Sequence, residues 1–421
     1  GNRGEERSQN MGSARVWIAG SYQSDYARNY AREGLEISDM VAEAVAGTLA
    51  DAGLEPADVD AIHVGNAFGQ LFTGQGQLGA MPATMEPALW GKPAARHEAA
   101  CASGSVATLA AMADIEAGHY DCVLVIGVEQ ERNVPGGDAP RHLGAAAWIG
   151  HEGEEATYMW PYMFSQLADE YDRRYGLDTQ YLHAIAELNM ANAKANPLAQ
   201  TRGWSFGPGG FADDDRDNPI VEGKLRRTDC AQVTDGTAGV LLVCDQFRSE
   251  RLGRSPAARI AGWGHGTAGL ALAPKFERSQ GQPYVFPHVR QVVTDAFRRA
   301  DLRGVADLDG IETHDCFSMS EYMAIDHFGI TGPGESWKAV ENGELTRDGA
   351  IPVNPSGGLI GGGHPVGATG VRMLHDARRQ VTGQAGDTQV DGARTFATLN
   401  IGGSLTTAVS FVVTAGSGSA E

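Results

Sequence analysis

The stretch Asp51-Ala-Gly-Leu-Glu-Pro-Ala-Asp-Val-Asp-Ala-Ile62 returns later in the chain as Ala300-Asp-Leu-Arg-Gly-Val-Ala-Asp-Leu-Asp-Gly-Ile311. Each copy follows a segment rich in alanine and valine that is typical of a helix. A second pair of similar segments, Ala14-Arg15-Val16 and Ala258-Arg259-Ile260, lies 244 positions apart, against 249 for the first pair. Two matches in nearly the same register predict two copies of one helix-and-strand unit, and therefore a duplicated α/β fold.

The apolar runs Val123-Leu-Val-Ile126 and Val240-Leu-Leu-Val243 predict buried strands in this fold. Between them, few strand-like runs occur, and Gly, Pro and Asp cluster near residues 206–218, which indicates an inserted loop domain. The polar chain ends are expected to be disordered. The predicted division is a disordered N-terminus (1–13), a first half (14–130 and 231–250), an inserted loop domain that binds substrate (131–230), a second half (251–415) and a frayed tail (416–421).

The composition describes a globular chain, because 42% of its 421 residues are apolar and only 20% are charged. No apolar run approaches the roughly 18 residues of a membrane span, and no charged leader with an apolar stretch opens the chain, so we expect neither a membrane span nor secretion. The net charge of −20 repels phosphate backbones and argues against nucleic-acid binding. Five widely spaced cysteines without a CxxC pair favour free thiols in a reducing compartment such as the cytoplasm, and argue against a zinc site.

Cys101 is the candidate nucleophile. It stands in Glu98-Ala-Ala-Cys101-Ala-Ser-Gly-Ser105, directly before a run of helix formers at 106–117. We expect it at the N-terminus of that helix, where the partial positive charge favours a thiolate and small neighbours admit a substrate. A buried structural cysteine is the alternative for any lone cysteine.

His364 is the candidate base. It follows five of the seven glycines in Asn354-Pro-Ser-Gly-Gly-Leu-Ile-Gly-Gly-Gly-His364-Pro-Val-Gly-Ala-Thr-Gly370. The spacing fits neither a phosphate-binding loop nor a dinucleotide fingerprint. Because glycines let the backbone approach a ligand closely, an imidazole here can act as a general base in an open site. A histidine that only fills a turn is the alternative.

A third motif, Ile311-Glu-Thr-His314-Asp-Cys316-Phe317, occupies the repeat position of Ile62-His-Val-Gly-Asn-Ala-Phe68. A glycine has become His314 and an alanine has become Cys316, which predicts an active site that belongs to one half of the duplicated scaffold. Alternate residues of a strand share a face, so His314 and Cys316 are expected to point the same way, with Asp315 left to structural hydrogen bonds. Metal binding by three successive residues is geometrically poor.

Together with Leu399-Asn-Ile-Gly-Gly-Ser404, these motifs resemble the thiolase family from about residue 14 to residue 413. The match rests on Cys101-Ala-Ser-Gly104 and Gly363-His-Pro-Val-Gly-Ala-Thr-Gly370, and Asp235-Gly-Thr-Ala-Gly239 looks like the strand that follows the loop domain of the family. The resemblance implies a duplicated five-layered α/β/α/β/α thiolase fold with an inserted loop domain.

Two departures from most thiolases matter. Most members have NEAF where this chain has His314-Asp-Cys-Phe317, and a CxGG cysteine where it has Asn400-Ile-Gly-Gly403. The HDCF form resembles the sterol-carrier-protein-type thiolases, in which the cysteine of HDCF takes over the proton transfer. The resemblance therefore implies that Cys316 compensates for Asn400, which itself has no proton-transfer role.

The resemblance implies an acyl-CoA C-acyltransferase that cleaves 3-ketoacyl-CoA by thiolysis, or runs the reverse Claisen condensation, through an acyl group on Cys101. His364 would activate Cys101, and Cys316 would move the α proton. The implied oxyanion-hole residues are Cys101, Gly402, His314 and His364. Lys224 and Arg226 lie where the family contacts the CoA phosphates. Coenzyme A enters as a substrate, with no permanently bound cofactor and no metal.

The family resemblance also implies a homodimer or homotetramer, and the HDCF type adds a small OB-fold protein as a candidate partner. Two other functions stay open. A decarboxylating condensing enzyme of the ketoacyl-synthase kind also uses one cysteine and two histidines, although Cys316 and the glycine-rich histidine motif count against it. The other is an acyltransferase subunit that works with the OB-fold partner.

Overall fold

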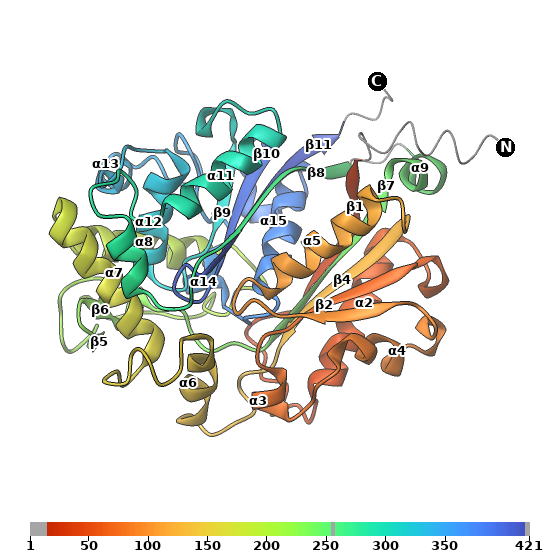
Figure 1. The fold of residues 1–421 in the computed structure, drawn as a ribbon, viewed down its shortest axis with the longest axis horizontal. Helices are drawn as coiled ribbons and strands as arrows, with labels where there is room; N and C mark the ends of the chain where they lie inside the picture. Colours follow the sequence, from red (N-terminus) through yellow and green to blue (C-terminus); the bar gives the residue numbers. More distant parts are fainter. Residues whose placement is uncertain (1–14, 254–256, 417–421) are drawn as a thin grey trace.

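The computed structural model describes residues 15–253 and 257–416 (Figure 1). The predicted disordered ends, 1–13 and 416–421, lie outside the described residues apart from Gly416, which ends the last strand. The strands of the main sheet are β1 (Val16–Gln23), β2 (Ala61–Gly65), β3 (Ala94–His97), β4 (Cys122–Glu129), β7 (Gly236–Cys244), β8 (Ala257–Thr267), β9 (Gly310–Thr313), β10 (Thr395–Gly402) and β11 (Thr407–Gly416). A small separate ribbon contains β5 (Ile220–Glu222) and β6 (Leu225–Arg226).

The strand order of the main sheet is β3-β2-β4-β7-β1-β8-β11-β10-β9. The first five strands in this order belong to the predicted first half of the fold (14–130 and 231–250), and the last four belong to the second half. Residues Val16–Ile18 of β1 pair with Ala258–Ile260 of β8 in antiparallel fashion. Val16 and Ile260, which belong to the two similar sequence segments, are partners in this pairing. The pairing of β1 with β8 joins the two half-sheets into one sheet of nine strands.

Helices cover both faces of this sheet. The longer ones are α2 (Ile37–Ala52), α5 (Ser103–Glu116), α7 (Met159–Tyr175), α8 (Gln180–Ala193), α11 (Pro287–Arg299), α12 (Ser318–Phe328) and α15 (Thr369–Val381). The shorter ones are α3 (Gly69–Thr73), α4 (Met81–Met85), α6 (Asp138–Leu143), α9 (Asp245–Phe247), α10 (Ala273–Arg278), α13 (Ser336–Glu341) and α14 (Gly358–Gly362). In the part of the chain that the model describes, no helix combines the length and the apolarity that crossing a membrane requires.

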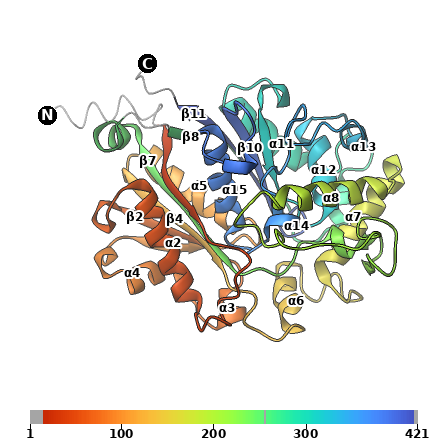
Figure 2. The ribbon, with the colours of Figure 1, turned by 180° about the vertical axis from the view of Figure 1, so that it is seen from behind.

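Three hydrophobic cores lie between the five layers, because one inner core contacts both half-sheets. Side chains alternate along a strand, so Val123 and Val125 of β4 face an inner core with α5 and α15, whereas Leu124 faces an outer core with α2. In the second half, Val409 of β11 faces the same inner core, and Val412 faces another outer core with α11 and α12. The helices α5 and α15 therefore lie between the half-sheets (Figures 1 and 2), which confirms the predicted α/β/α/β/α architecture.

The duplication extends to single hydrogen bonds. Asp60, just before β2, accepts the backbone N–H groups of residues 121 and 122, at the start of β4. Asp309, at the same repeat position before β9, accepts those of residues 394 and 395, at the start of β10. Between the halves, Gly104 of α5 and Gly370 of α15 meet so closely that a Cβ on Gly370 would lie 2.7 Å from a backbone nitrogen of α5. Each crossing glycine is the second residue of its helix, so the two helices are related in register.

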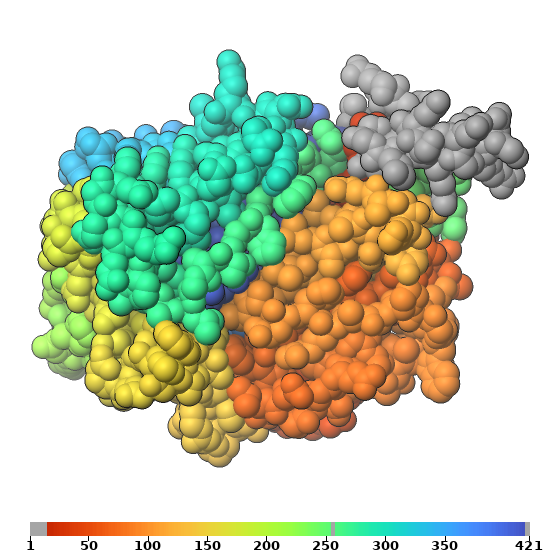
Figure 3. Space-filling model, in the orientation of Figure 1, coloured from red at the N-terminus to blue at the C-terminus, as the bar shows by residue number. Residues whose placement is uncertain are grey.

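Residues 131–230 carry α6, α7, α8 and the small ribbon. Their largest apolar side chains do not form a core of their own. Met163 and Leu167 of α7 share one core with Phe317 and Tyr322 of the second half. In the space-filling view, this yellow region accordingly lies against the green second half (Figure 3). The region therefore forms one wall of any site at the end of β9.

Candidate active site

Cys101 lies in a tight turn that enters α5. The preceding residue, Ala100, has a left-handed backbone with φ of 51°, which a residue with a side chain adopts only at some cost. Local hydrogen bonds hold the turn: the Glu98 carboxylate accepts the Ala100 N–H, and the Ser103 hydroxyl donates to the Ala100 carbonyl and accepts the Ala99 N–H. Because α5 begins at Ser103, Cys101 lies at its N-terminal end, as predicted.

His364 lies in the loop between α14 and α15, after Gly363, whose φ of 112° requires glycine. Its backbone N–H donates to the Thr234 hydroxyl at 2.9 Å. Its Nδ1 lies 2.6 Å from the Thr369 hydroxyl, which in turn donates to the Pro365 carbonyl. With that hydroxyl proton engaged, Nδ1 carries the ring proton, which leaves Nε2 as an acceptor. Nε2 is buried and has no hydrogen-bond partner in the described structure, so its lone pair is available to a substrate or a thiol.

His314 and Cys316 follow β9 directly and line the same cavity as Cys101 and His364. The shared face of His314 and Cys316 is as the strand geometry predicted. Asp315 points the other way, where its carboxylate accepts the backbone N–H groups of Leu359 and Ile360 in α14. Asp315 therefore fixes the glycine-rich segment that carries His364.

Asn400, at the end of β10, connects these parts. Its Nδ2 donates to the Cys101 carbonyl at 3.0 Å and lies 3.2 Å from Nδ1 of His314, and its Oδ1 accepts from the Ser105 hydroxyl. The Ile401 backbone N–H also points at Nδ1 of His314. Two donors at Nδ1 place the ring proton on Nε2, so His314 presents a donor where His364 presents an acceptor.

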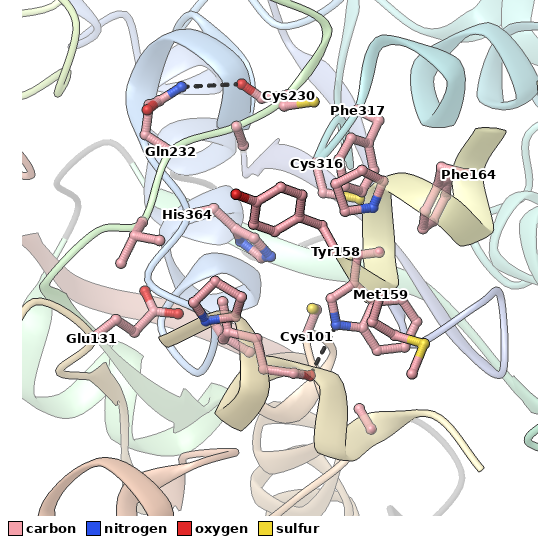
Figure 4. Close-up of a pocket in the computed structure, with 18 of the residues that line it drawn as sticks. Cys101, Glu131, Tyr158, Met159, Phe164, Cys230, Gln232, Cys316, Phe317 and His364 are labelled. Carbon is pink, nitrogen blue, oxygen red and sulfur yellow. Dashed lines mark hydrogen bonds between the residues drawn. The ribbon is translucent and has the colours of Figure 1, made fainter. Parts of the chain in front are cut away.

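The Cys101 sulfur, a ring nitrogen of His314 and a ring nitrogen of His364 all lie within 4.8 Å of one another. Figure 4 shows Cys101 and His364 at this cavity. The two imidazole rings are nearly perpendicular, at 89°, with centroids 5.1 Å apart. They border a cavity of about 240 Å³ whose wall is otherwise mostly apolar. The apolar lining includes Phe68, Leu143, Tyr158, Met159, Trp160, Phe164, Val221 and Phe317. A thiol, a proton acceptor and a proton donor thus converge at an apolar cavity, an arrangement that suits covalent acyl transfer.

Burial keeps every one of these groups neutral. It raises the pKa of the Cys101 thiol well above its usual value, and Cys316 and Glu131 act in the same direction. It lowers the pKa of His364 to about 3 and that of His314 well below its usual value. The predicted thiolate at the helix N-terminus is therefore wrong for the resting site, because loss of solvation outweighs the helix end. The thiol loses its proton only when His364 accepts it.

The pKa of Cys316 is also raised by burial, to about 12, although the Ser320 hydroxyl 3.3 Å from its sulfur partly offsets this shift. Cys316 therefore rests as a thiol. It can act as a base only if its own proton first leaves, which couples its use to the state of the neighbouring groups in the cavity.

Two successive glycines, Gly402 and Gly403, follow Asn400 and Ile401 near the nucleophile. Gly403, rather than Gly402, lines the cavity, and its backbone N–H points towards the Cys101 sulfur. The Cβ position of Gly402 instead faces the Ala99 carbonyl, only 2.2 Å away, so this site requires glycine for close packing. The Gly403 N–H is thus a backbone donor beside the nucleophile, and the assignment of Gly402 to the oxyanion hole stays a prediction.

Lys224 and Arg226, the predicted phosphate contacts, are both occupied by carboxylates. The Lys224 ammonium lies 2.8 Å from Asp169 and 3.1 Å from Asp172. The Arg226 guanidinium lies within 3.2 Å of two further aspartates. Neither residue lines the cavity that holds Cys101. The structure therefore does not bring these cations into the site.

Three features of the site were missed or undervalued from the sequence. Glu131 and Cys230 line the cavity. In the sequence, Glu131 marks only the start of the predicted loop domain, and Cys230 is only one of five free thiols. Asn400 holds both His314 and the Cys101 turn, although it was given no part in proton transfer and no other role. One cysteine and two histidines in one cavity are also zinc-type ligands, and Cys101, His314 and His364 are the one such cluster among the described residues.

Comparison with known proteins gives the family of this chain. Residues 16–202 match the family described as "Thiolase, N-terminal domain", and residues 275–415 match "Thiolase C-terminal domain-like". Acetyl-CoA acetyltransferase of Methanothermobacter thermautotrophicus is 33% identical over 87% of this chain and 91% of its own. Sterol carrier protein 2 of Gallus gallus is 28% identical over 92% of this chain and 70% of its own.

Solved structures share the fold at lower identity. The structure described as "Ltp2-ChsH2(DUF35) aldolase" has a TM-score of 0.76 and 22% identity over 95% of this chain and 98% of the other. Human mitochondrial 3-ketoacyl-CoA thiolase in complex with CoA has a TM-score of 0.69 and 14% identity over 96% and 98%. The chain belongs to the thiolase family. It is an acyltransferase, as the sequence motifs predicted.

Proposed function

We propose that this protein transfers acyl groups between 3-ketoacyl-CoA and CoA through a thioester on Cys101. One observation carries the proposal: the Cys101 sulfur lies within 4.8 Å of the reactive nitrogens of His314 and His364, at the inner end of an apolar cavity. His364 offers an unpartnered acceptor to the thiol. In the first step the Cys101 proton passes to His364 while the sulfur attacks the 3-keto carbon.

As the sulfur–carbon bond forms, the bond between C2 and C3 of the substrate breaks, and its electron pair becomes the enolate of the departing acetyl-CoA. The backbone N–H groups of Cys101 and Gly403 are placed to stabilise the first oxyanion, and Nε2–H of His314 the enolate oxygen. Cys316 supplies the proton that C2 takes up. Free CoA then attacks the acyl thioester, its thiol proton passes to the Cys316 thiolate, and Cys101 leaves with the proton that His364 holds.

The HDCF residues and the 28% identity with sterol carrier protein 2 support placement in the sterol-carrier-protein-type subgroup. The test is a scan of 3-ketoacyl-CoA thioesters of different chain length, with free CoA as the acceptor. Turnover of at least one, absent in Cys101→Ser, supports thiolase chemistry. Products formed from malonyl-type but not from acetyl-type thioesters would support the decarboxylating alternative instead.

A second candidate is an acyltransferase subunit that works with an OB-fold partner. It is supported by the pairing of Lys224 and Arg226 with aspartates, which leaves the CoA phosphates without these cations. Trp148, Ile149 and Tyr158 are exposed, and Tyr158 also borders the cavity. A partner that covers this apolar surface could supply the missing positive charge. Co-purification from the native source, followed by a comparison of KM for CoA with and without the partner, tests this candidate.

The oligomeric state and the cellular compartment of the protein are part of this proposal. We expect a homodimer or homotetramer, since β3 forms an edge of the main sheet and Ala94 and Ala95 on it are exposed. All five cysteines are free, which suits a reducing compartment such as the cytoplasm. Light scattering at working concentration tests the assembly, and a monomer would contradict it.

A further inference from the structure

Two glutamates near the cavity differ sharply in their hydrogen bonds. Glu129 ends β4, and both of its carboxylate oxygens are fully used: Oε1 accepts the N–H groups of Ala67 and Gly367, and Oε2 accepts that of Phe68 and the Asn66 side-chain amide. Its role is structural. Glu131, two residues on, has far fewer donors: the Thr234 N–H lies 3.3 Å from Oε2, and the Val366 N–H also faces the carboxyl group.

Glu131 is almost completely buried, with 1% of its surface exposed, and it lines the cavity with Cys101 and His364 (Figure 4). No lysine, arginine or histidine within the described ranges forms an ion pair with it. The adjacent Arg132 turns away and donates to the Ala27 and Arg28 carbonyls. A buried carboxyl group without a cation and with few donors is costly as an anion, and it can act as a hydrogen-bond donor once protonated.

The charged and titratable groups around Glu131 act against its ionisation. Glu129 lies on the preceding strand and Asp235 just before β7, and Cys101 and His364 face the cavity from two other segments. Burial raises the pKa of Glu131 well above its usual value, with Glu129 and Asp235 adding to the shift and backbone N–H groups of Thr234 and Val366 opposing it. Burial and the two neighbouring carboxylates therefore favour the protonated, neutral form of Glu131.

The reaction needs such a donor. In the condensation direction, the departing CoA has taken the proton from His364 before the enolate forms, so Nε2 of His364 accepts rather than donates. Of the two histidines, His314 alone is then left to stabilise the enolate oxygen. We propose that Glu131 is a further substrate-contacting residue, which donates a hydrogen bond from the cavity wall to the thioester oxygen of a 3-oxoacyl substrate or of the enolate derived from it. This inference rests on the proposed acyl transfer.

The donated hydrogen bond requires no transfer of the Glu131 proton. As the bond between C2 and C3 breaks, negative charge develops on the thioester oxygen, and the O–H group of Glu131 stabilises it in place while Cys316 returns a proton to C2. The carbonyl that Cys101 attacks is a different one. Loss of Glu131 should consequently slow enolate formation much more than acylation of Cys101 by a simple acyl-CoA.

The test compares Glu131→Met and Glu131→Gln with the matched control Glu187→Gln, on the exposed side of α8. Methionine keeps the length but has no donor, whereas glutamine keeps a neutral donor. In Glu131→Met we expect deuterium exchange into acetyl-CoA and thiolysis to fall about 10- to 100-fold, with labelling of Cys101 by acetyl-CoA reduced less than about threefold. Glu131→Gln should restore much of the loss.

The pH profile separates this role from a structural one. As pH rises through the raised pKa of Glu131, the wild-type enzyme loses the donor and gains a negative charge beside Cys101, so exchange should fall at alkaline pH. Glu131→Gln should lose this alkaline decline. Glu131→Met should also unfold at a higher temperature than the wild type, because a buried, poorly satisfied carboxyl group has been removed.

Exchange within twofold of wild type in Glu131→Met would overturn the proposal, as would an equal loss of exchange and labelling in that variant. Absence of both labelling and exchange in the wild-type protein would instead overturn the proposed function. The two failures are therefore distinguishable.

Discussion

The two halves of this protein carry the same elements but end in different chemistry. At the end of β2 the first half has Gly65 and Ala67, and at the end of β9 the second half has His314 and Cys316. A Cβ on Gly65 would lie 2.7 Å from the backbone of α5, so no side chain fits there. In the second half the same position opens into a cavity. The duplicated fold thus has two equivalent strand ends, and only the end of β9 has room for reactive side chains.

The helix that follows each nucleophile position shows the same contrast. Cys101 stands two residues before α5, and Gly367 stands two residues before α15. The N–H of Gly367 donates to the Glu129 carboxylate at 3.1 Å, so a side chain of the protein itself fills the position that substrate oxygen would take beside Cys101. The position that repeats the active site, around Gly367, is thus closed by Glu129 and serves stability.

The largest expected effect concerns His364, the acceptor that distinguishes the open site. His364→Ala should slow acylation of Cys101 by about 10³-fold, because no other group in the cavity is placed to take the thiol proton. The rate is measured by quenched mass spectrometry after mixing with acyl-CoA. His119→Ala, at an exposed residue shortly after α5, is the control. Acylation within tenfold of wild type would shift the base to another residue.

Cys316 occupies the repeat position of Ala67, so its replacement by alanine tests whether this difference between the halves matters for catalysis. Cys316→Ala makes the second half resemble the first, and should leave Cys101 acylation within about threefold while α-proton exchange falls by about 10²- to 10³-fold. Deuterium uptake from heavy water into acetyl-CoA measures the exchange. If both signals disappear, Cys316 is only structural, and if both persist, another group is the base.

Asn400 contacts both the Cys101 carbonyl and His314, although no role was predicted for it from the sequence. Asn400→Ala removes a donor from Nδ1 of His314 and a partner from the Cys101 carbonyl, so the proton of His314 is no longer fixed on Nε2. We expect α-proton exchange to fall about tenfold, as for other positioning partners of a histidine. Asn400→Asp replaces the donor with an acceptor and should be worse than alanine. A wild-type rate in both variants would restore the view that Asn400 is dispensable.

The smallest effect on turnover is expected in the closed half. Glu129→Gln replaces a carboxylate that accepts four hydrogen bonds, and should lower the free energy of unfolding by about 1–3 kcal/mol. Urea denaturation measures the loss. Turnover per folded molecule should stay within about threefold. Unchanged stability together with lost acylation would mean that the closed position around Gly367 and Glu129 also takes part in catalysis.

The sequence repeat was sufficient to predict the duplicated layers, because hydrophobic patterns and strand ends are local. It also placed Cys101, His314, Cys316 and His364, since each stands at a recognisable strand or helix end. The neutral state of the site was not predictable, because the helix end is local whereas burial of Cys101 depends on segments far apart in the chain. The same holds for Glu131, whose missing partners appear only when β4, the Thr234 segment and the glycine-rich loop meet.

The sequence also suggested Lys224 and Arg226 as phosphate contacts from their place beside the last strand of the first half. Their aspartate partners lie between 11 and 55 residues away, so the pairing arises from the packing of the loop region on α7 and not from a local motif. Whether a cation is free for a ligand depends on its neighbours in space.

The central claim is that a single half of the duplicated fold carries the acyl group, on Cys101. It is tested most directly by incubating the wild-type protein with an acyl-CoA, digesting it and locating the acyl adduct by mass spectrometry. Cys230 and Cys316 lie in the same cavity and serve as internal controls. We predict one acyl group per chain, on the peptide that contains Cys101, and none in Cys101→Ser. An adduct on Cys316 or Cys230 in the wild-type protein would contradict the account.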